Sequence, residues 1–354
     1  MAKNKIYIID VTNRDGVQTS RICLSKLQKT MINLYLNEMG IYQSEFGFPV
    51  TRHETNYLNA NLELARMGVL KPIILEGWIR AIPEDVEKAT TLTEVEHLNL
   101  SISTSKQMIQ GKFRGKFSKE DVIRVMTEAV DLAREKGIKT IGVNAEDASR
   151  TDMDYLIQFA RKAKEHGAQR IRYCDTLGFD NPFTIYERVK ELAKRIKIPV
   201  EIHCHNDLGM VVANSLAGAK AAIDAGVDAY INTTINGMGE RAGNADLVSV
   251  ILALKYSSGF RDSYLLDERV KLNLAWKIAK YASYAFNVPI PINQPGVGAN
   301  AFAHESGIHV DGALKDRRNY ELYDYEELGR GDPEIIETGR RITVGEYSGI
   351  KGFR

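Results

Sequence analysis

Long apolar stretches, an excess of one charge and a set of pairable cysteines are all missing from this sequence of 354 residues. No run of about 18 apolar residues occurs, and about that length is needed for a helix to cross a membrane. The first residues, MAKNKIYIID, also lack the apolar run of a signal peptide. We therefore expect a cytoplasmic protein with no membrane partner.

The charge is almost balanced, with 47 Lys and Arg against 46 Asp and Glu and a formal net charge of +1. Because no basic excess is available to neutralise a phosphate backbone, nucleic acid is not an expected partner. Three scattered cysteines, an odd number, argue against a disulfide framework. The remaining classes are a globular intracellular enzyme and a binding protein.

What the sequence does contain is a repeated unit, in which an apolar, β-branched run is followed by a turn and a helical pattern. The helical stretches carry apolar residues at i, i+3 and i+4, and Ser118 followed by Asp121 predicts a helix start. Five helical stretches stop at a glycine, which can close a helix in the left-handed conformation: Gly40, Gly68, Gly137, Gly167 and Gly226. The expected strands are 5–12, 41–46, 71–78, 97–104, 139–146, 169–176, 199–206 and 228–235.

Eight β-then-α units in roughly 250 residues predict a (β/α)8 TIM barrel. The alternative is a doubly wound open sheet, which usually carries a glycine-rich turn after its first strand, whereas DVTNRDG has one glycine. After about residue 260 the pattern changes to helices and a loop-rich segment. We expect a catalytic barrel over 1–260 and an appended C-terminal subdomain over 261–354 that contributes to the active site.

A barrel places functional side chains at the C-terminal ends of its strands. His203 and His205 lie two apart on an expected strand, so their imidazoles project together while Cys204 faces the helices as a packing residue. This pair suggests a divalent metal, and Asp15, at the mouth of the first strand, can complete a site of two imidazoles and one carboxylate. Hydrogen-bonded core histidines and a turn aspartate beside Gly16 are the plainer alternatives.

Two further loops carry possible chemistry. GMGERAGN (237–244) has three glycines that are expected to leave backbone amides exposed, and Arg241 adds a cation for a phosphate-bearing or thioester ligand. HESGIH (304–309) places histidines where one can act as a general acid or base over the barrel mouth. A simple turn and a solvated loop are the alternatives.

Together these residues resemble a known family. DVTNRDGVQ (10–18) is similar to the D-x-T-x-R-D/E-G-x-Q signature of the DRE-TIM metallolyases. Within that group the chain resembles the acyl-CoA-condensing synthases that make 2-isopropylmalate, homocitrate, citramalate or citrate. The resemblance continues, in order, through EFGFP (45–49), EDASRTD (146–152), CDTLG (174–178), HCHND (203–207), GMGERAGN (237–244), FAHESGIHVDG (302–312) and YSG (347–349).

The resemblance implies a metal site that chelates a 2-oxo acid and polarises its carbonyl. The metal is a divalent ion, for which Mn2+, Co2+, Mg2+ and Zn2+ all remain open. The ligands that the resemblance implies are Asp15, His203, His205 and Asn244.

The resemblance also implies roles in substrate binding and proton transfer. Arg14 matches an arginine that stabilises the developing alkoxide or enolate, and Thr176 and Gln18 match residues that bind the 2-oxo acid. The acid–base set that removes a proton from acetyl-CoA is Glu146, His309 and Tyr320. The implied acetyl-CoA contacts are Gly237, Gly239, Glu240, Arg241 and Gly243.

Two departures from the family pattern bear on function. Asn13 stands where the family commonly has leucine, so we expect it to alter contacts with the substrate. The chain also stops shortly after YSGIKG, so feedback control by a further C-terminal domain is not expected.

The substrate is expected to be a dicarboxylate. Arg80, Arg150 and His53 fall near predicted strand ends, where each can meet a distal carboxylate, with an ion pair away from the site as the alternative. Oxaloacetate giving citrate and 2-oxoglutarate giving homocitrate both fit. The segments DVTNRDGVQTSRICLSKLQKT and HETNYLNANLELA are more similar to Re-face-specific citrate synthases, which favours oxaloacetate.

Functions of other classes are less well supported. A lyase of the hydroxymethylglutaryl-CoA type is expected to carry a cysteine in the glycine loop, and GMGERAGN has none. A non-catalytic partner subunit of a split synthase is disfavoured because the metal strand ends and the His309 segment occur in one chain. The resemblance also implies a homodimer, in which the C-terminal region of one subunit covers the barrel of its neighbour.

Overall fold

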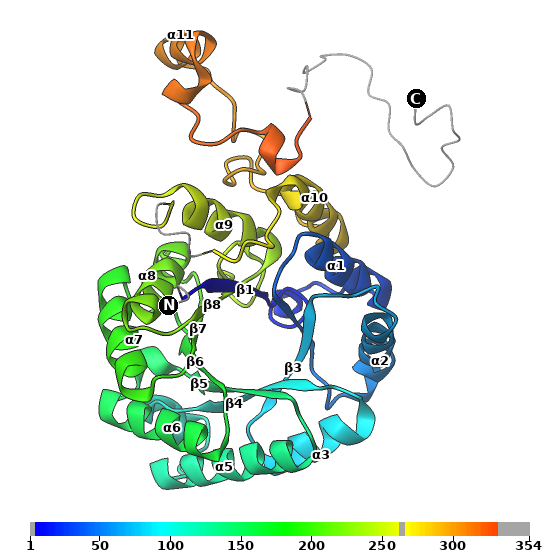
Figure 1. Ribbon diagram of the computed structural model, residues 1–354, viewed down its shortest axis with the longest axis vertical. Helices are drawn as coiled ribbons and strands as arrows, with labels where there is room; N and C mark the ends of the chain where they lie inside the picture. The colour runs from blue at the N-terminus through cyan, green and yellow to red at the C-terminus, as the bar shows by residue number, and fades with distance from the viewer. Residues whose placement is uncertain (1–3, 262–265, 332–354) are drawn as a thin grey trace.

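The structure is a computed structural model that describes residues 4–261 and 266–331. Eight parallel strands close into a barrel in sequence order (Figure 1). This result confirms the TIM barrel, and the open-sheet alternative is wrong. The YSG motif lies outside the described residues. The strands are β1 (Ile6–Asp10), β2 (Gln43–Gly47), β3 (Ile74–Arg80), β4 (His97–Ser103), β5 (Thr140–Glu146), β6 (Arg170–Asp175), β7 (Val200–Cys204) and β8 (Ala229–Thr233).

Helices alternate with the strands and surround the barrel (Figure 1). Their ends follow local signals, since Ser118 and Asp121 form a reciprocal capping box at the start of α5. The five predicted terminal glycines all have positive φ, from 78° to 114°. The helices are α1 (Lys26–Glu38), α2 (Arg52–Arg66), α3 (Pro83–Leu92), α4 (Lys106–Gly111), α5 (Lys119–Glu135), α6 (Met153–His166), α7 (Pro182–Ile196), α8 (Val211–Asp224), α9 (Leu247–Tyr256), α10 (Ala275–Phe286) and α11 (Gly307–Lys315).

The main apolar core lies between the strands and the helices. One face of each strand, with residues such as Ile8, Leu100 and Ile202, is fully buried in this cluster. Cys204 is 1% exposed within the same cluster, which confirms its predicted packing role. Because side chains alternate along a strand, the other face of each strand fills the barrel interior.

The barrel interior holds ion pairs, although branched apolar side chains usually fill this space. Arg172 on β6 pairs with Glu45 on β2 and, at 2.6 Å, with Glu201 on β7. Arg170 Nη2 lies 2.6 Å from Glu76 on β3. A β6 side chain can contact β2 and β3 only across the interior, so these charges are buried at the centre of the barrel.

The C-terminal region has two parts. Helix α10 packs against α1 and against the short helix η3 (Ile235–Gly237), so it belongs to the helical layer around the barrel. Residues 297–331, which we call the arm, are anchored where Leu328 is buried and where Glu327 contacts Lys255 and Tyr256. From this anchor α11 extends away from the barrel (Figure 1).

Among the helices in these two described ranges, none combines the length and the apolar character that a bilayer crossing requires.

Candidate metal centre and active site

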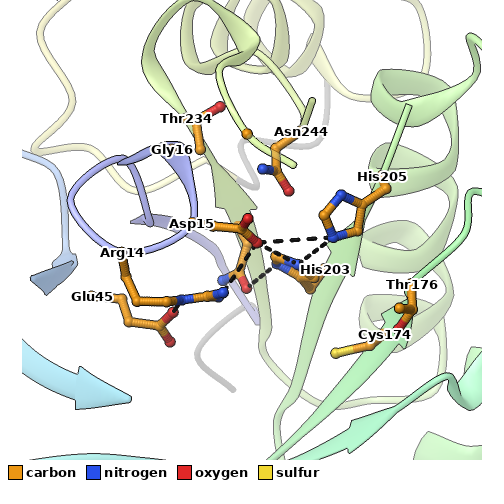
Figure 2. Close-up of polar contacts among 12 residues, drawn as sticks. Arg14, Asp15, Gly16, Glu45, Cys174, Thr176, His203, His205, Thr234 and Asn244 are labelled. Atoms are coloured by element: carbon orange, nitrogen blue, oxygen red, sulfur yellow. Dashed lines mark hydrogen bonds and ion pairs between the residues drawn. The ribbon is translucent and has the colours of Figure 1, made fainter. Parts of the chain in front are cut away.

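Two strand ends bring one carboxylate and two imidazoles together at the mouth of the barrel. Asp15 follows β1, His203 is on β7 and His205 comes directly after it. Asp15 Oδ2 lies 3.1 Å from His203 Nε2 and 3.9 Å from His205 Nε2, and the two Nε2 atoms are 3.3 Å apart. Figure 2 shows the three side chains converging on one point.

A tight turn after β1 puts Asp15 in this place. The carbonyl of Val11 accepts hydrogen bonds from the amides of Arg14, Asp15 and Gly16, at 3.1, 2.8 and 3.1 Å. This turn folds the chain back over the strand end and buries the Asp15 side chain, which is 3% exposed. The histidines need no such turn, because the pleat of β7 already directs both to one face.

The electrostatics of the cluster suit a cation. Burial alone would raise the pKa of Asp15, but the charge of the neighbouring Arg14 guanidinium holds the pKa of this carboxyl well below its usual range. Burial and the neighbouring His203 lower the pKa of His205 to about 4. At neutral pH the site therefore presents an ionised carboxylate and a neutral His205 imidazole.

Unpartnered polar atoms in the cluster point to a missing ligand. Within the described part of the chain, Asp15 Oδ1 and Asn244 Oδ1 are buried without a hydrogen-bond partner, although such atoms are costly to leave unsatisfied. Asn244 Nδ2 donates to the Met238 carbonyl at 3.2 Å, and Figure 2 shows the side chain pointing toward Asp15 and His205. The predicted ligand set is thus brought together and fits a divalent ion.

Arg14 lies beside this cluster, as the resemblance implied. Its Nη1 is 3.1 Å from Asp15 Oδ2, and its Nε pairs with Glu45 in the barrel interior. The guanidinium also lies over the ring of Trp78, 5.2 Å from the ring centroid. Contacts with the turn after β1, with β2 and with β3 thus hold the cation at the mouth of the barrel.

Glu146 and Thr176 lie on the neighbouring strand ends. Glu146 accepts hydrogen bonds from Ser103 and from Lys112 Nζ, the latter at 2.6 Å. Thr176 Oγ1 accepts from the amide of Asp147 at 2.9 Å. Both side chains are at the barrel mouth, as predicted, and Lys112 adds a cation that the sequence did not single out.

The glycine loop after β8 behaves differently from the prediction. Its amides are not free, because Gly237 N donates to Thr234 O, Gly239 N to Thr19 Oγ1 and Gly243 N to Glu240 O. The expectation that these glycines leave their backbone amides exposed is therefore wrong.

The glycines are instead needed because the neighbouring atoms leave no room for a Cβ. A Cβ on Gly239 would lie 2.0 Å from Asn244 Nδ2, and a Cβ on Gly243 would lie 2.0 Å from Gly237 O. Arg241, the loop cation, is paired with Asp207 at 2.8 Å. The loop thus wraps tightly around Asn244, while Glu240 and Arg241 stay at the surface.

His309 and Tyr320 lie together, but far from the metal cluster. Their ring centroids are 4.4 Å apart, and both residues are exposed. They belong to the part of the arm that extends away from the barrel (Figure 1). Within one chain, therefore, they do not meet Glu146 or Asp15.

The residues predicted to read a distal carboxylate have other partners. Arg80 is held by Asp85 through bonds of 2.8 and 2.7 Å, and Arg150 is held by Asp147 at 2.7 Å. Arg150 also lines a pocket of about 650 Å³ to which none of the metal-cluster residues contributes. His53 and Gln18 are exposed, at the start of α2 and in the helix η1 (Gly16–Gln18).

Asn13 points away from the site. It is fully buried, and its Nδ2 donates to Lys29 O and to Asn33 Oδ1, both at 2.9 Å. Asn33 is in turn bonded to Tyr57 and Asn61. The expectation that Asn13 alters substrate contacts is therefore wrong, and its amide joins the turn carrying Asp15 to α1 and α2.

Sequence reasoning missed the interior residues behind the metal cluster. Glu201 precedes His203 by two positions, so the alternation of a strand already places both on one face. Arg170 and Arg172 have the same parity as Cys174 on β6, and Asn232 is on the inner face of β8. The signal that the sequence offered was a set of charged side chains at alternate positions of the predicted strands, on the face that points into the barrel.

A closed (β/α)8 barrel with two imidazoles, a carboxylate and an arginine at the C-terminal mouth defines a metal-dependent enzyme for small substrates. A profile described as HMGL-like matches residues 5–281, and one described as homocitrate synthase post-HMGL domain-like matches residues 297–347. The chain belongs to the HMGL-like family, and the predicted resemblance to its synthases is confirmed.

Two individual relatives and one solved structure show which proteins this chain is similar to. A protein named citrate (Re)-synthase from Dehalococcoides mccartyi is 64% identical over 351 residues, covering 99% of this chain and 85% of that protein. A 2-isopropylmalate synthase from Caldanaerobacter subterraneus is 42% identical, covering 97% and 83%. The solved hydroxymethylglutaryl-CoA lyase from Pseudomonas aeruginosa has a TM-score of 0.65 at 15% identity, covering 81% of this chain and 95% of that one, and shares the fold.

Proposed function

We propose that this protein is a cytoplasmic Re-face-specific citrate synthase, which converts acetyl-CoA, oxaloacetate and water to citrate and CoA. The observation that carries the proposal is the 64% identity, over 99% of this chain, to the protein named citrate (Re)-synthase. The geometry of Asp15, His203, His205 and Asn244 supports it, because these donors suit a divalent ion. Such an ion, when bound, supplies Lewis-acid polarisation of the 2-oxo carbonyl.

Arg14 and Thr176 prepare the site for the oxo acid. Arg14 is fixed by Asp15 and Glu45, so its charge is preorganised for the alkoxide that forms on the former keto oxygen. The Thr176 hydroxyl, on the neighbouring strand end, is placed to donate to the substrate carboxylate while it accepts from the Asp147 amide.

The condensation needs a base for the acetyl methyl group. In the proposal, an acid–base set of Glu146, His309 and Tyr320 removes an α-proton, and the enolate carbon attacks the keto carbon of oxaloacetate. The alkoxide takes up a proton, and water then cleaves the thioester to release CoA and citrate. In the proposal, the glycine loop after β8 contacts the acetyl-CoA thioester.

A homodimer is part of the proposal, because His309 and Tyr320 do not reach the barrel of their own chain (Figure 1). In a two-fold dimer the arm of one subunit can cover the mouth of its neighbour. Exposed apolar side chains on α11 support such a contact, since Ile308 is 76% and Leu314 is 84% exposed. In this arrangement the barrel over 1–260 binds the oxo acid and supplies Glu146, and the region 261–354 supplies His309 and Tyr320.

Homocitrate synthesis from 2-oxoglutarate is the second candidate, favoured by the match to the homocitrate synthase post-HMGL profile. Synthesis of 2-isopropylmalate or citramalate ranks below it. Their substrates, 2-oxoisovalerate and pyruvate, lack the second carboxylate that the polar barrel mouth suits. Arg80 and Arg150 remain proposed contacts for that carboxylate, on condition that they leave Asp85 and Asp147 when substrate binds.

The test is CoA-thiol release from acetyl-CoA with oxaloacetate, 2-oxoglutarate, 2-oxoisovalerate or pyruvate, each with Mn2+ and with a chelator. We expect chelator-sensitive turnover with oxaloacetate. Asp15→Asn is expected to lose more than about 100-fold in turnover. Asp10→Asn is the matched control, because Asp10 is similarly buried at the end of β1, just before the turn that carries Asp15, and burial raises its pKa to about 7.

The outcomes separate the candidates. Preference for 2-oxoglutarate would overturn citrate synthesis in favour of homocitrate synthesis and leave the metal site intact. Thiol release from none of the four would restore the lyase and partner-subunit alternatives. With oxaloacetate as substrate, isotopically labelled acetyl-CoA reports the face of attack, because it determines which of the two carboxymethyl groups of citrate carries the label.

A further inference from the structure

The second ring nitrogen of His203 has a buried partner of its own. His203 Nδ1 lies 3.0 Å from Asn232 Oδ1, and Asn232, on β8, is 2% exposed. Nε2 of the same ring faces Asp15 and His205 at the metal cluster. The contact to Asn232 therefore decides how this imidazole is presented to an ion.

The orientation of the Asn232 amide follows from its other neighbour. Asn232 Nδ2 lies 2.7 Å from Glu201 Oε1. A carboxylate can only accept hydrogen bonds, so the NH2 group faces Glu201 and the amide oxygen faces His203. That oxygen needs a donor, which places the proton of His203 on Nδ1 and leaves the Nε2 lone pair for the metal.

Glu201 is itself fixed from the centre of the barrel. Its Oε1 lies 2.7 Å from Arg172 Nε and 2.6 Å from Arg172 Nη2, and both side chains are 0% exposed. The same guanidinium contacts Glu45, which holds Arg14. One buried arginine thus supports both a metal-binding histidine and the arginine that faces the substrate.

We infer that Asn232, held by Glu201 and Arg172, is a positioning residue that orients His203 and fixes its metal-binding nitrogen. The inference rests on the metal site of the proposed function but not on its substrate. Partners of this kind typically contribute 10- to 100-fold in metal affinity. Asn232 acts through His203 and contacts no reacting atom.

Two substitutions of Asn232 separate positioning from stability. Asn232→Leu removes the acceptor for His203 Nδ1–H, whereas Glu201 keeps Arg172. Asn232→Asp keeps that acceptor, but it sets a second carboxylate against Glu201, so the fold is expected to lose stability. A purely structural residue would make metal affinity follow stability in both variants.

The measurement is Mn2+ affinity by chelator competition on metal-free protein, beside its melting temperature. We expect Asn232→Leu to bind Mn2+ about 10- to 100-fold more weakly. Asn232→Asp is expected to stay within about tenfold of the unmodified protein despite a lower melting temperature. Asn99→Leu is the matched control, because Asn99 is a buried interior amide with no side-chain partner among the described residues.

Equal Mn2+ affinity in Asn232→Leu and in the unmodified protein would overturn the inference. The inference would also be overturned if both Asn232→Leu and Asn232→Asp lost Mn2+ affinity in proportion to their loss of melting temperature. A third measurement uses only the unmodified protein, so it does not depend on whether a variant folds. In the Zn2+-loaded unmodified protein, the Nδ1–H proton of His203 is expected to be protected from solvent exchange, and free exchange would also overturn the inference.

Discussion

Two glutamates inside the barrel ionise differently because of the arginines they meet. Burial raises the pKa of both carboxyls, but Arg14 and Arg172 together lower the pKa of Glu45 below its ordinary value. Glu76 is buried to the same degree, and there the charge of Glu201 adds to burial, so its pKa is raised to about 8 despite Arg170. Glu76 is therefore mostly protonated at neutral pH, which leaves two interior arginines facing two carboxylates.

This shift makes the stability of the protein depend on pH. Below about pH 4.5 the Glu76 carboxyl is protonated in both the folded and the unfolded chain. Between about 4.5 and 8 the unfolded chain loses this proton while the folded chain keeps it, so the free energy of unfolding falls as pH rises.

We expect Glu76→Gln to flatten that fall, because glutamine does not titrate and its Oε1 can still accept from Arg170. The gain over the unmodified protein at pH 8 is a few kcal/mol at most. Urea unfolding at pH 5, 6.5 and 8 measures it. Glu84→Gln on the exposed face of α3 is the control, and equal slopes in the two variants would contradict the expectation.

At the scale of an element, the loop over 237–244 shows how backbone shape serves the metal cluster. Gly239 has a φ of 157° and faces the Asn244 amide. The chain passes so close to Asn244 that no side chain fits between them. The loop therefore holds Asn244 Oδ1 toward the cluster by close contact rather than by a hydrogen bond to that oxygen.

Gly239→Ala tests this role. Its Cβ would lie 2.0 Å from Asn244 Nδ2, so we expect Asn244 to be displaced, with at least about a tenfold loss of Mn2+ affinity and of turnover. Gly209→Ala is the control, because Gly209 also has positive φ, at 74°, but open space around its Cβ. It carries the backbone strain, about 1 kcal/mol, without the clash. Equal effects of the two substitutions would rule out a steric role.

The elements themselves were predictable because their signals are local. The period of two in KIYIIDVT or PVEIHCHN and the terminal glycines mark strands and helix ends within a few residues, so all eight strands were found. The same alternation correctly paired His203 with His205. Asp15 was found because it follows the first strand at the mouth of the barrel, where functional side chains gather.

Contacts that depend on barrel register or on loop shape were not predictable. Arg172 reaches Glu45 across 127 residues of chain, and alternation shows only that both point inward. Arg80 and Arg150 were placed near strand ends correctly, yet Arg80 is bonded to Asp85 on α3, five residues away, and Arg150 to Asp147, three residues away. Likewise, the glycine amides of the loop over 237–244 donate hydrogen bonds to acceptors within the protein and are not free.

At the scale of the whole molecule, the proposed acid–base residues and the metal cluster are separated within one chain. The arm is firmly anchored at its base, where Leu328 is fully buried and Glu327 meets Lys255. Its outer part is held by its own contacts, including His304 with Glu321 at 3.2 Å. Because the arm presents His309 and Tyr320 away from its own barrel, the proposed function requires that the barrel of another subunit receives them.

Subunit mixing decides whether the arm acts on a neighbouring chain. His203→Ala removes the metal side of a site and His309→Ala removes the arm side, so each variant alone is expected to be nearly inactive. After denaturation and joint refolding of equal amounts, half of the dimers are hybrids, and in each hybrid one site combines an intact barrel with an intact arm. Random pairing therefore predicts recovery of about a quarter of the unmodified activity. If each arm served its own barrel, every site in a hybrid would carry one substitution, and the mixture would stay as inactive as its components.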